Sequence, residues 1–195
     1  PQEPETAPPE NAEPEISGDE APVLLYMGQA SMRVVTPEGK VIYIDPYAGD
    51  AYDLPADLIL VTHGHFDHIG GNNRFDKVYL SESDFPVLED YDKEMLNRWM
   101  KELTREAAQP FLTAPKEWKC MRTLDFDSFD LGHMRCEIIS LRGHTAGSVG
   151  IWIPSERLLL SGDALTPVMC LNFQNHLSKQ AQYETLMRVQ SLEFD

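Results

Sequence analysis

A cluster of histidines directly after a short apolar segment constrains this chain more than any other feature. The apolar residues 58–61 (LILV) have the length and composition of a buried strand. The segment 63–68 (HGHFDH) comes next, so this strand would deliver imidazoles and a carboxylate to the edge of a sheet. Divalent metals, zinc foremost, bind such donors. A polar loop that is rich in histidine by chance is the alternative, and it is disfavoured because three of the six histidines lie in these six residues.

His63, His65 and His144 would form one metal site. His144 follows a predicted strand, in the segment 142–148 (RGHTAGS). Three neutral imidazoles with the fourth position left to water are the arrangement of catalytic rather than structural zinc. Gly64 is expected to permit backbone angles that a bulkier residue would resist, so that the rings on either side of it turn inward.

Asp67, His68 and Asp163 indicate a second metal beside the first. Asp163 follows another predicted strand, in the segment 161–163 (SGD), and is placed to bridge the two ions. A water shared by two such ions loses its proton near neutral pH and becomes a hydroxide nucleophile. Asp67 is the candidate catalytic residue of this set. The sequence therefore predicts metal-assisted hydrolysis that needs no Ser or Cys nucleophile.

The order of the predicted elements indicates an α/β fold. Strands followed by helices occur twice, which favours two sheets packed face to face with helices outside. A capping-box-like helix start is predicted at residues 81–84. The first block has predicted strands at 23–27, 32–36, 41–44, 58–61 and 77–80 and an amphipathic helix at 90–106. The second block has predicted strands at 123–130, 134–141, 148–153 and 157–161 and a helix at 178–192.

Three motifs together resemble those of the metallo-beta-lactamase superfamily. They are, in this order, HGHFDH (63–68), RGHTAGS (142–148) and LLLSGDAL (158–165). The resemblance covers the chain from about residue 22 onward. It implies an αββα sandwich of two mixed β-sheets flanked by helices, with a dinuclear metal site at one edge of the sheets. It also implies two zinc ions in the complete protein, with iron or manganese as alternatives.

The donor set resembles particular branches of that superfamily. Asp67 and His68 with no Cys ligand are similar to the glyoxalase II and lactonase branches. The segment 26–31 (YMGQAS) is similar to the lactonase-like branch, although many of its members carry His where this chain has Gln29. Members of the superfamily usually supply a final His to the second metal from a segment after the last helix. The chain ends at Asp195, before such a residue, so we expect a domain that lacks its last segment; a second site that is one ligand short is the alternative.

Several neighbours of the predicted ligands have two readings. Asp45 would either hold a ligand imidazole in one tautomer or cap the turn before Pro46. Thr145 and Ser148 would either fix the loop of the third histidine by hydrogen bonds or cap a turn. His133 and His176 are expected at the surface. His176 lies just past Asp163 in the chain, so contact with a substrate is the alternative for this residue.

The first 21 residues differ in composition from the rest. They are rich in Pro, Glu and Ala, and residues 1–20 carry seven acidic residues and no Lys or Arg. We expect an acidic, proline-rich, disordered linker at 1–21 and one domain at 22–195, because such a segment cannot bury enough apolar surface to fold. The linker and the absence of an initial Met favour an extracytoplasmic location, secreted or tethered to a surface. A flexible terminus of a cytoplasmic protein is the alternative.

Bulk properties argue against several classes of protein. No run is long and apolar enough to cross a bilayer, so no transmembrane segment is expected. Cys120, Cys136 and Cys170 include no CxxC pair, which indicates neither a disulfide framework nor a thiolate zinc site. A formal net charge of −16 repels phosphate backbones, so nucleic acid is not an expected partner.

The leading functional hypothesis is a dinuclear zinc hydrolase that acts on a small ester, thioester, lactone or amide. A redox or sulfur-transfer member of the superfamily, with iron at similar ligands, is one alternative. A metal-binding protein with an incomplete, inactive site is another. The expected partner is a small-molecule substrate, and the sequence leaves the substrate's identity and the oligomeric state open.

Overall fold

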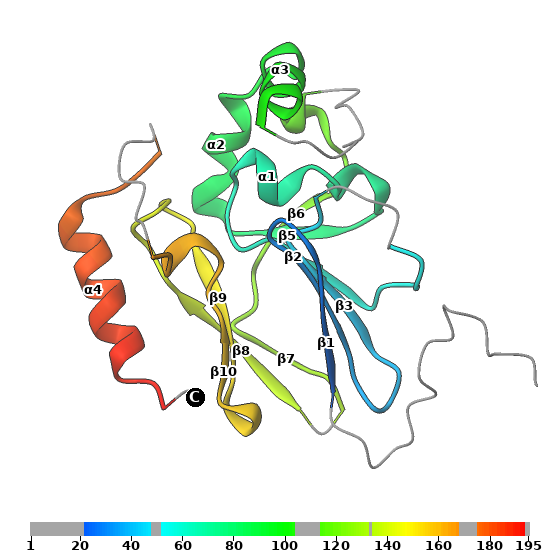
Figure 1. Ribbon diagram of the computed structural model, residues 1–195, viewed down its shortest axis with the longest axis vertical. Helices are drawn as coiled ribbons and strands as arrows, with labels where there is room; N and C mark the ends of the chain where they lie inside the picture. Colours follow the sequence, from blue (N-terminus) through cyan, green and yellow to red (C-terminus); the bar gives the residue numbers. More distant parts are fainter. Residues whose placement is uncertain (1–21, 48–51, 104–113, 133, 168–174, 194–195) are drawn as a thin grey trace, which may run out of the picture.

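Two β-sheets form the centre of the computed structural model, which describes residues 22–47, 52–103, 114–132, 134–167 and 175–193 (Figure 1). The predicted linker at 1–21 and His133 lie outside these residues. The first sheet has the strand order β1-β2-β3-β4-β5-β6, with the bounds β1 (Val23–Gly28), β2 (Ser31–Val35), β3 (Val41–Ile44), β4 (Leu58–Leu60), β5 (Val78–Leu80) and β6 (Met121–Thr123). The second sheet has the order β10-β9-β8-β7, with the bounds β7 (Ser128–Asp130), β8 (Arg135–Ser140), β9 (Val149–Ile153) and β10 (Leu158–Leu160).

The first sheet is mixed and the second is antiparallel. Strands β1, β2 and β3 pair antiparallel, whereas β3, β4, β5 and β6 run parallel to one another. In the second sheet all pairs are antiparallel, so β8 and β10 point in the same direction. Because the carboxyl ends of parallel strands meet at one edge of a sheet, the loops after β3, β4 and β5 lie together.

Alternating side chains of the strands separate the molecule into four layers. On β3, Val41 and Tyr43 pack in one hydrophobic cluster and Ile42 and Ile44 in another. The first cluster covers the outer face of the first sheet and includes residues of helices α1 (Phe66–Ile69), α2 (Phe85–Glu89) and α3 (Lys93–Leu103). The second cluster fills the space between the sheets. Side chains alternate across a strand with period two, which is why one short strand serves both clusters.

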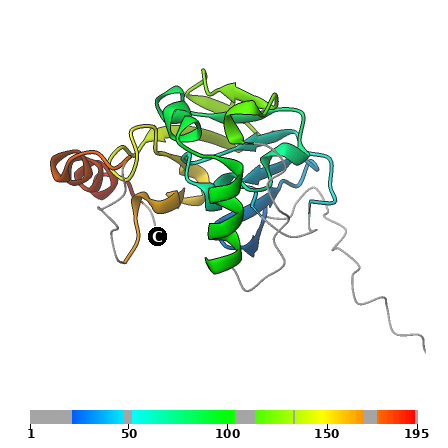
Figure 2. The same ribbon diagram turned by 90° about the horizontal axis from the view of Figure 1, so that it is seen from above.

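The outer face of the second sheet is covered by α4 (Lys179–Gln190). Trp152 of β9 and Val189 of α4 belong to a third buried cluster on this face. Figures 1 and 2 show α4 at one side of the molecule, well separated from α1, α2 and α3. The layer order is helix, sheet, sheet, helix, which confirms the predicted αββα sandwich. No helix in the described ranges combines the length and the hydrophobicity that crossing a membrane requires.

Two local predictions were wrong. The strand expected at 123–130 is two strands in different sheets, because the chain leaves the first sheet after Leu124, whose N–H donates to the carbonyl of Leu80 at 2.8 Å, and joins the second sheet at β7. The capping box expected at 81–84 is also absent. Ser81 makes no side-chain capping hydrogen bond, a 3-10 turn (Glu82–Asp84) precedes α2, and the side chain of Asp84 is fully buried.

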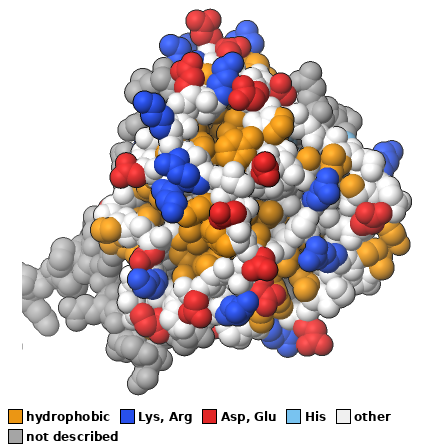
Figure 3. Space-filling view, turned by 180° about the vertical axis from the view of Figure 1, so that it is seen from behind, with side chains coloured by type: hydrophobic (Ala, Val, Ile, Leu, Met, Phe, Trp, Pro, Cys, Tyr) orange, Lys and Arg blue, Asp and Glu red, His pale blue; other side chains and the backbone are white. Residues whose placement is uncertain are grey.

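Charged side chains of both signs are mixed on the surface. On the face shown in Figure 3, Lys and Arg are interspersed with Asp and Glu around a central band of hydrophobic side chains. Among the described residues, large hydrophobic side chains are exposed on two elements, Val23, Leu24, Leu25 and Tyr26 of β1 and Tyr183, Leu186 and Met187 of α4. Because charges of both signs alternate on the face shown in Figure 3, that face carries no continuous basic surface.

Candidate metal centre

Loops from both sheets meet at one edge of the sandwich, and each of them carries polar side chains. The sheets are joined there by a hydrogen bond from the backbone N–H of Val149 to the carbonyl of Thr62, at 2.9 Å. The polar side chains that follow the strands are Asp45 after β3, His63, His65, Asp67 and His68 after β4, Asp84 after β5, His144 after β8 and Asp163 after β10.

His63, His65 and His144 form the first ligand group. Nδ1 of His65 lies 3.0 Å from Nε2 of His63 and 2.9 Å from Nε2 of His144. All three side chains are buried. Burial lowers the pKa of each imidazole, that of His65 to about 3, and neighbouring imidazoles lower the pKa of His63 further. Neutral imidazole is the form that binds metals, so these residues are in the ligating state at neutral pH.

The geometry of this group fits a metal ion. A ring nitrogen carries at most one hydrogen, so protons alone cannot satisfy both close contacts of His65 Nδ1 equally. A cation between the three nitrogens satisfies all of their lone pairs. Zinc bound tetrahedrally at about 2.0–2.1 Å separates its ligand nitrogens by about 3.4 Å, so the ring nitrogens, now 2.9 and 3.0 Å apart, would have to move outward by about 0.4 Å to admit it.

His63, His68 and Asp163 form a second ligand group beside the first, with one donor atom of each within 4.8 Å of the others. Asp163 spans the two groups. Its Oδ1 lies 3.5 Å from Nε2 of His68 and its Oδ2 lies 3.7 Å from Nε2 of His144. Burial alone would raise the pKa of the Asp163 carboxyl, but the nearby histidines lower it below its ordinary value. An ionised carboxylate between two donor groups is suited to contact two cations.

Asp45 holds the histidines of both groups in defined tautomers. Its Oδ2 accepts a hydrogen bond from Nδ1 of His68 at 2.9 Å and from Oγ1 of Thr62 at 2.7 Å. The Thr62 oxygen lies in turn 3.2 Å from Nδ1 of His63. These bonds keep a hydrogen on Nδ1 of His63 and of His68 and direct the Nε2 atoms of these two residues toward the metal centre. Of the two readings of Asp45, the structure therefore supports the one in which it orients ligands; its φ of 50° is a left-handed angle that Asp tolerates.

Asp67 lies next to the second group but is not part of it. Its Oδ2 is 4.0 Å from Nε2 of His68, and its side chain is partly exposed. The same oxygen accepts a hydrogen bond from Nε2 of Gln29 at 3.2 Å. Gln29 has a φ of 53°, in the turn between β1 and β2. The turn thus brings a side chain to the open side of the centre, a contact that the sequence did not predict.

Gly64 is favoured for a different reason from the one expected. Its φ does not lie in the left-handed region. A Cβ atom at this position would lie 3.1 Å from the carbonyl oxygen of Asp84 and 3.1 Å from Cβ of Val87. The loop of the first two histidines packs directly against the start of α2, so limited space rather than backbone angle disfavours a side chain at this position.

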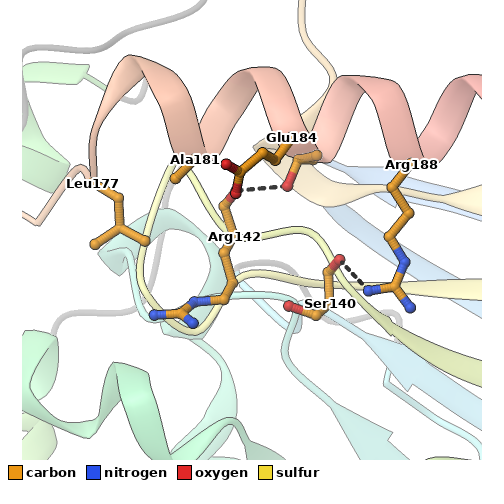
Figure 4. Close-up of a pocket in the computed structure, with 7 residues that line it drawn as sticks. Ser140, Arg142, Leu177, Ala181, Glu184 and Arg188 are labelled. Carbon is orange, nitrogen blue, oxygen red and sulfur yellow. Dashed lines mark hydrogen bonds between the residues drawn. The ribbon is translucent and has the colours of Figure 1, made fainter.

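The segment around His144 is fixed from both sides. Thr145 and Ser148 bond to each other, with the N–H of Thr145 donating to Oγ of Ser148 at 3.0 Å. Figure 4 shows α4 on the other side, where Oγ1 of Thr185 donates to the carbonyl of Arg142 at 2.6 Å. The Arg142 side chain donates through Nε to the carbonyl of Ala146 at 3.0 Å. The hydrogen-bonding reading of Thr145 and Ser148 is therefore the one that the structure supports.

Two further residues, His176 and Asp84, lie near the ligand groups without belonging to them. His176 is half-buried rather than exposed, and its Nδ1 lies 2.8 Å from the carbonyl oxygen of Gly143. It belongs to neither ligand group of the described residues. Asp84 is a contact of the centre that the sequence did not predict. Its carboxylate contacts the loops of His63 and of His144, although nothing in its sequence neighbourhood other than an unused capping signal sets it apart.

Comparison with known proteins agrees with the fold. The family model of the metallo-beta-lactamase superfamily matches residues 34–189. The crystal structure of TTHA1623 in a di-iron-bound form superposes with a TM-score of 0.61 at 27% sequence identity, covering 88% of this chain and 86% of that chain.

Curated relatives match shorter parts of the chain. A UPF0173 metal-dependent hydrolase of Polynucleobacter asymbioticus is 46% identical over 59 residues, which are 24% of this chain and 21% of that protein. A hydroxyacylglutathione hydrolase of Brucella anthropi is 27% identical over 114 residues, 58% of this chain and 35% of that protein. The chain thus matches well under two thirds of the length of these relatives. With the family model matching most of its residues, the chain belongs to the metallo-beta-lactamase superfamily.

Proposed function

We propose that this chain forms the metal-binding part of a metal-dependent hydrolase that cleaves a small ester, thioester, lactone or amide. One observation carries the proposal. Two groups of buried or half-buried donors lie next to each other at the same edge of the sandwich, with the Asp163 carboxylate between them, which is the arrangement expected for two neighbouring ions. The relatives named metal-dependent hydrolase and hydroxyacylglutathione hydrolase support the reaction class.

The residues have distinct proposed roles. His63, His65 and His144 would hold the first ion, and His68 and Asp163 the second, with Asp163 shared. When bound, the ions would provide a nucleophile from water at neutral pH and polarise the bond under attack. Asp67 would complete the second group and orient the attacking water by accepting its proton at Oδ2, since this oxygen lies on the open side of the centre, 4.0 Å from Nε2 of His68.

A small substrate suits the space beside the second group. A cavity of about 230 Å³ lies there, and His68, Asp45 and Asp163 are among its lining residues. Apolar side chains of the two sheets, among them Met32 and Leu160, line it as well. This volume is below the range of about 300–1,000 Å³ that is usual for ligand sites, so only a small group would enter it. An acyl chain or a lactone ring would fit an apolar wall next to polar donors.

We propose zinc as the metal, because a group of three neutral imidazoles with an open position is typical of catalytic zinc. Iron is the second candidate, favoured by the di-iron form of TTHA1623. A redox or sulfur-transfer reaction would accompany iron. Elemental analysis of the purified protein separates the two metals.

A hydrolysis panel tests the proposed function. Zinc-loaded protein would be assayed against short esters, thioesters, lactones and amides, then stripped with a chelator and reloaded. We expect hydrolysis of at least one class that disappears with the metal and returns with it. Metal-loaded protein that hydrolyses none of these classes would contradict the proposal, and iron content with thiol oxidation would favour the second candidate.

A further inference from the structure

We infer that Asp84 is a positioning residue for the first ligand group. Its carboxylate joins the two chain segments that carry the three histidines of this group. The inference rests on the proposed function in one respect, namely that the group binds a metal. Asp84 itself belongs to neither ligand group, and its side chain is completely buried.

Three hydrogen bonds converge on this carboxylate. Oδ2 accepts from the backbone N–H of Gly64 at 2.8 Å and from Oγ1 of Thr145 at 2.7 Å. Oδ1 accepts from the backbone N–H of Gly147 at 2.6 Å. Gly64 stands between His63 and His65, whereas Thr145 and Gly147 follow His144 in the chain. One side chain from the first sheet therefore connects a loop of the first sheet with a loop of the second.

Both segments pack closely against Asp84, with little space between them and this residue. A Cβ atom on Gly147 would lie 2.7 Å from Cγ of Asp84, and one on Gly64 would lie 3.1 Å from the Asp84 carbonyl oxygen. The loop of His144 thus touches the Asp84 carboxylate directly, and the loop of His63 and His65 packs against the Asp84 backbone and bonds the same carboxylate. Since the loops carry His65 and His144, the same contact fixes how far apart the nitrogens of these two residues lie, which is 2.9 Å.

The hydrogen bonds require a carboxylate and not an amide. All three partners are donors, and they contact both oxygens of Asp84. Asparagine offers one acceptor oxygen, so its NH₂ group would face a buried donor on one side. A buried donor without an acceptor is costly, and the loop on that side would move away to find another partner. Asp84→Asn should therefore separate the loops without removing any ligand.

The test measures metal binding directly and compares matched variants. Asp84→Asn would be compared with Asp57→Asn, which removes a carboxylate that bonds Lys40 and the N–H of Val41 at the opposite ends of β3 and β4. Thr145→Val and Thr145→Ser form a second pair, because only serine keeps the hydroxyl that donates to Asp84. For each protein, the affinity for the first equivalent of Zn²⁺ is measured by competition with a chelator, and the visible spectrum is recorded with Co²⁺.

We expect Asp84→Asn to lose about tenfold or more in Zn²⁺ affinity, as found for residues that orient ligands, and to change the Co²⁺ spectrum. Asp57→Asn should stay within about twofold of the unmodified protein, and Thr145→Ser should bind more tightly than Thr145→Val. If Asp84→Asn fails to fold, the two Thr145 variants decide.

The inference is overturned if Asp84→Asn keeps the affinity and the Co²⁺ spectrum of the unmodified protein, if it loses no more affinity than Asp57→Asn, or if Thr145→Ser and Thr145→Val bind equally. Tight metal binding without hydrolysis would contradict the proposed function alone, because neither readout depends on turnover. Unmodified protein that binds no metal would overturn both.

Discussion

Oδ2 of Asp45 lies 2.9 Å from Nδ1 of His68, and both side chains are almost completely buried. Burial alone would lower the pKa of His68, but the carboxylates of Asp45 and Asp163 outweigh it and raise the pKa to about 10. A metal ion at Nε2 would therefore replace a proton there. Because Asp45 accepts a hydrogen bond from Nδ1 of His68, Nε2 is the atom that faces Asp163 and the second ligand group. The orientation of His68 therefore depends on a residue that would not itself touch a metal.

Replacing Asp45 should impair the second group more than the first. Asp45→Asn keeps the shape but removes the charge that holds His68 and Thr62. Loss of such a partner typically weakens metal binding by about 10–100-fold. We expect this loss for the second equivalent of Zn²⁺ and a smaller one for the first, measured by stepwise competition with a chelator. If Asp45→Asn bound the second equivalent of Zn²⁺ as tightly as the unmodified protein does, this role would be contradicted.

Asp163 should matter for the second ion and for turnover together. Asp163→Asn removes the charge next to both groups, so the second equivalent of metal should bind much more weakly than the first. Hydrolysis should fall by about 100-fold or more, as when a group that stabilises charge in the transition state is lost. Parallel metal titrations and rate measurements check this, with His176→Ala as the comparison. A variant with normal activity and both metals in place would show that Asp163 is not shared.

The sequence was sufficient to nominate the donors because each follows a short apolar strand. His63, His65 and His144 could be grouped in advance, since strand ends meet at one edge of a sandwich, and the structure brings them together. Asp84 could not be found in this way. Its partners lie up to 63 residues away, and its local sequence predicted a helix cap.

The fold was predictable in its layers but not in every connection. The order of strands followed by helices, twice over, predicted two sheets, and each strand was found from its local pattern. Residues 123–130 look like one strand for the same reason, although they cross from β6 to β7. Alternation does not reveal which sheet a residue joins. The role of Gly64 was also inaccessible, because the limited space around it is created by α2.

Asp57 makes the stability of the fold dependent on pH in a defined direction. Hydrogen bonds from Lys40 and from the N–H of Val41 lower the pKa of Asp57 below its ordinary value of 3.8. A lowered pKa in the folded state stabilises the protein above the unfolded pKa, and this contribution is lost as the pH falls through the folded pKa.

We expect Asp57→Asn to lower Tm by about 1–3 °C at pH 7, since exposed ion pairs contribute little. The difference from the unmodified protein should shrink below pH 3.8 and vanish below the folded pKa. Metal-free samples of both proteins, compared by circular dichroism, check this. A difference in Tm that is the same at pH 7 and pH 2 would show that packing and not charge is responsible.

Metal content tests the central claim most directly. His63 is one of the three imidazoles of the first ligand group, so its loss should leave that group unable to hold an ion tightly. Elemental analysis after dialysis should find close to one or more equivalents of transition metal in the unmodified protein and in His176→Ala, and almost none in His63→Ala, because two imidazoles bind far more weakly than three. Folded, unmodified protein without metal, even after incubation with Zn²⁺, would contradict the account, as would His63→Ala with a full complement.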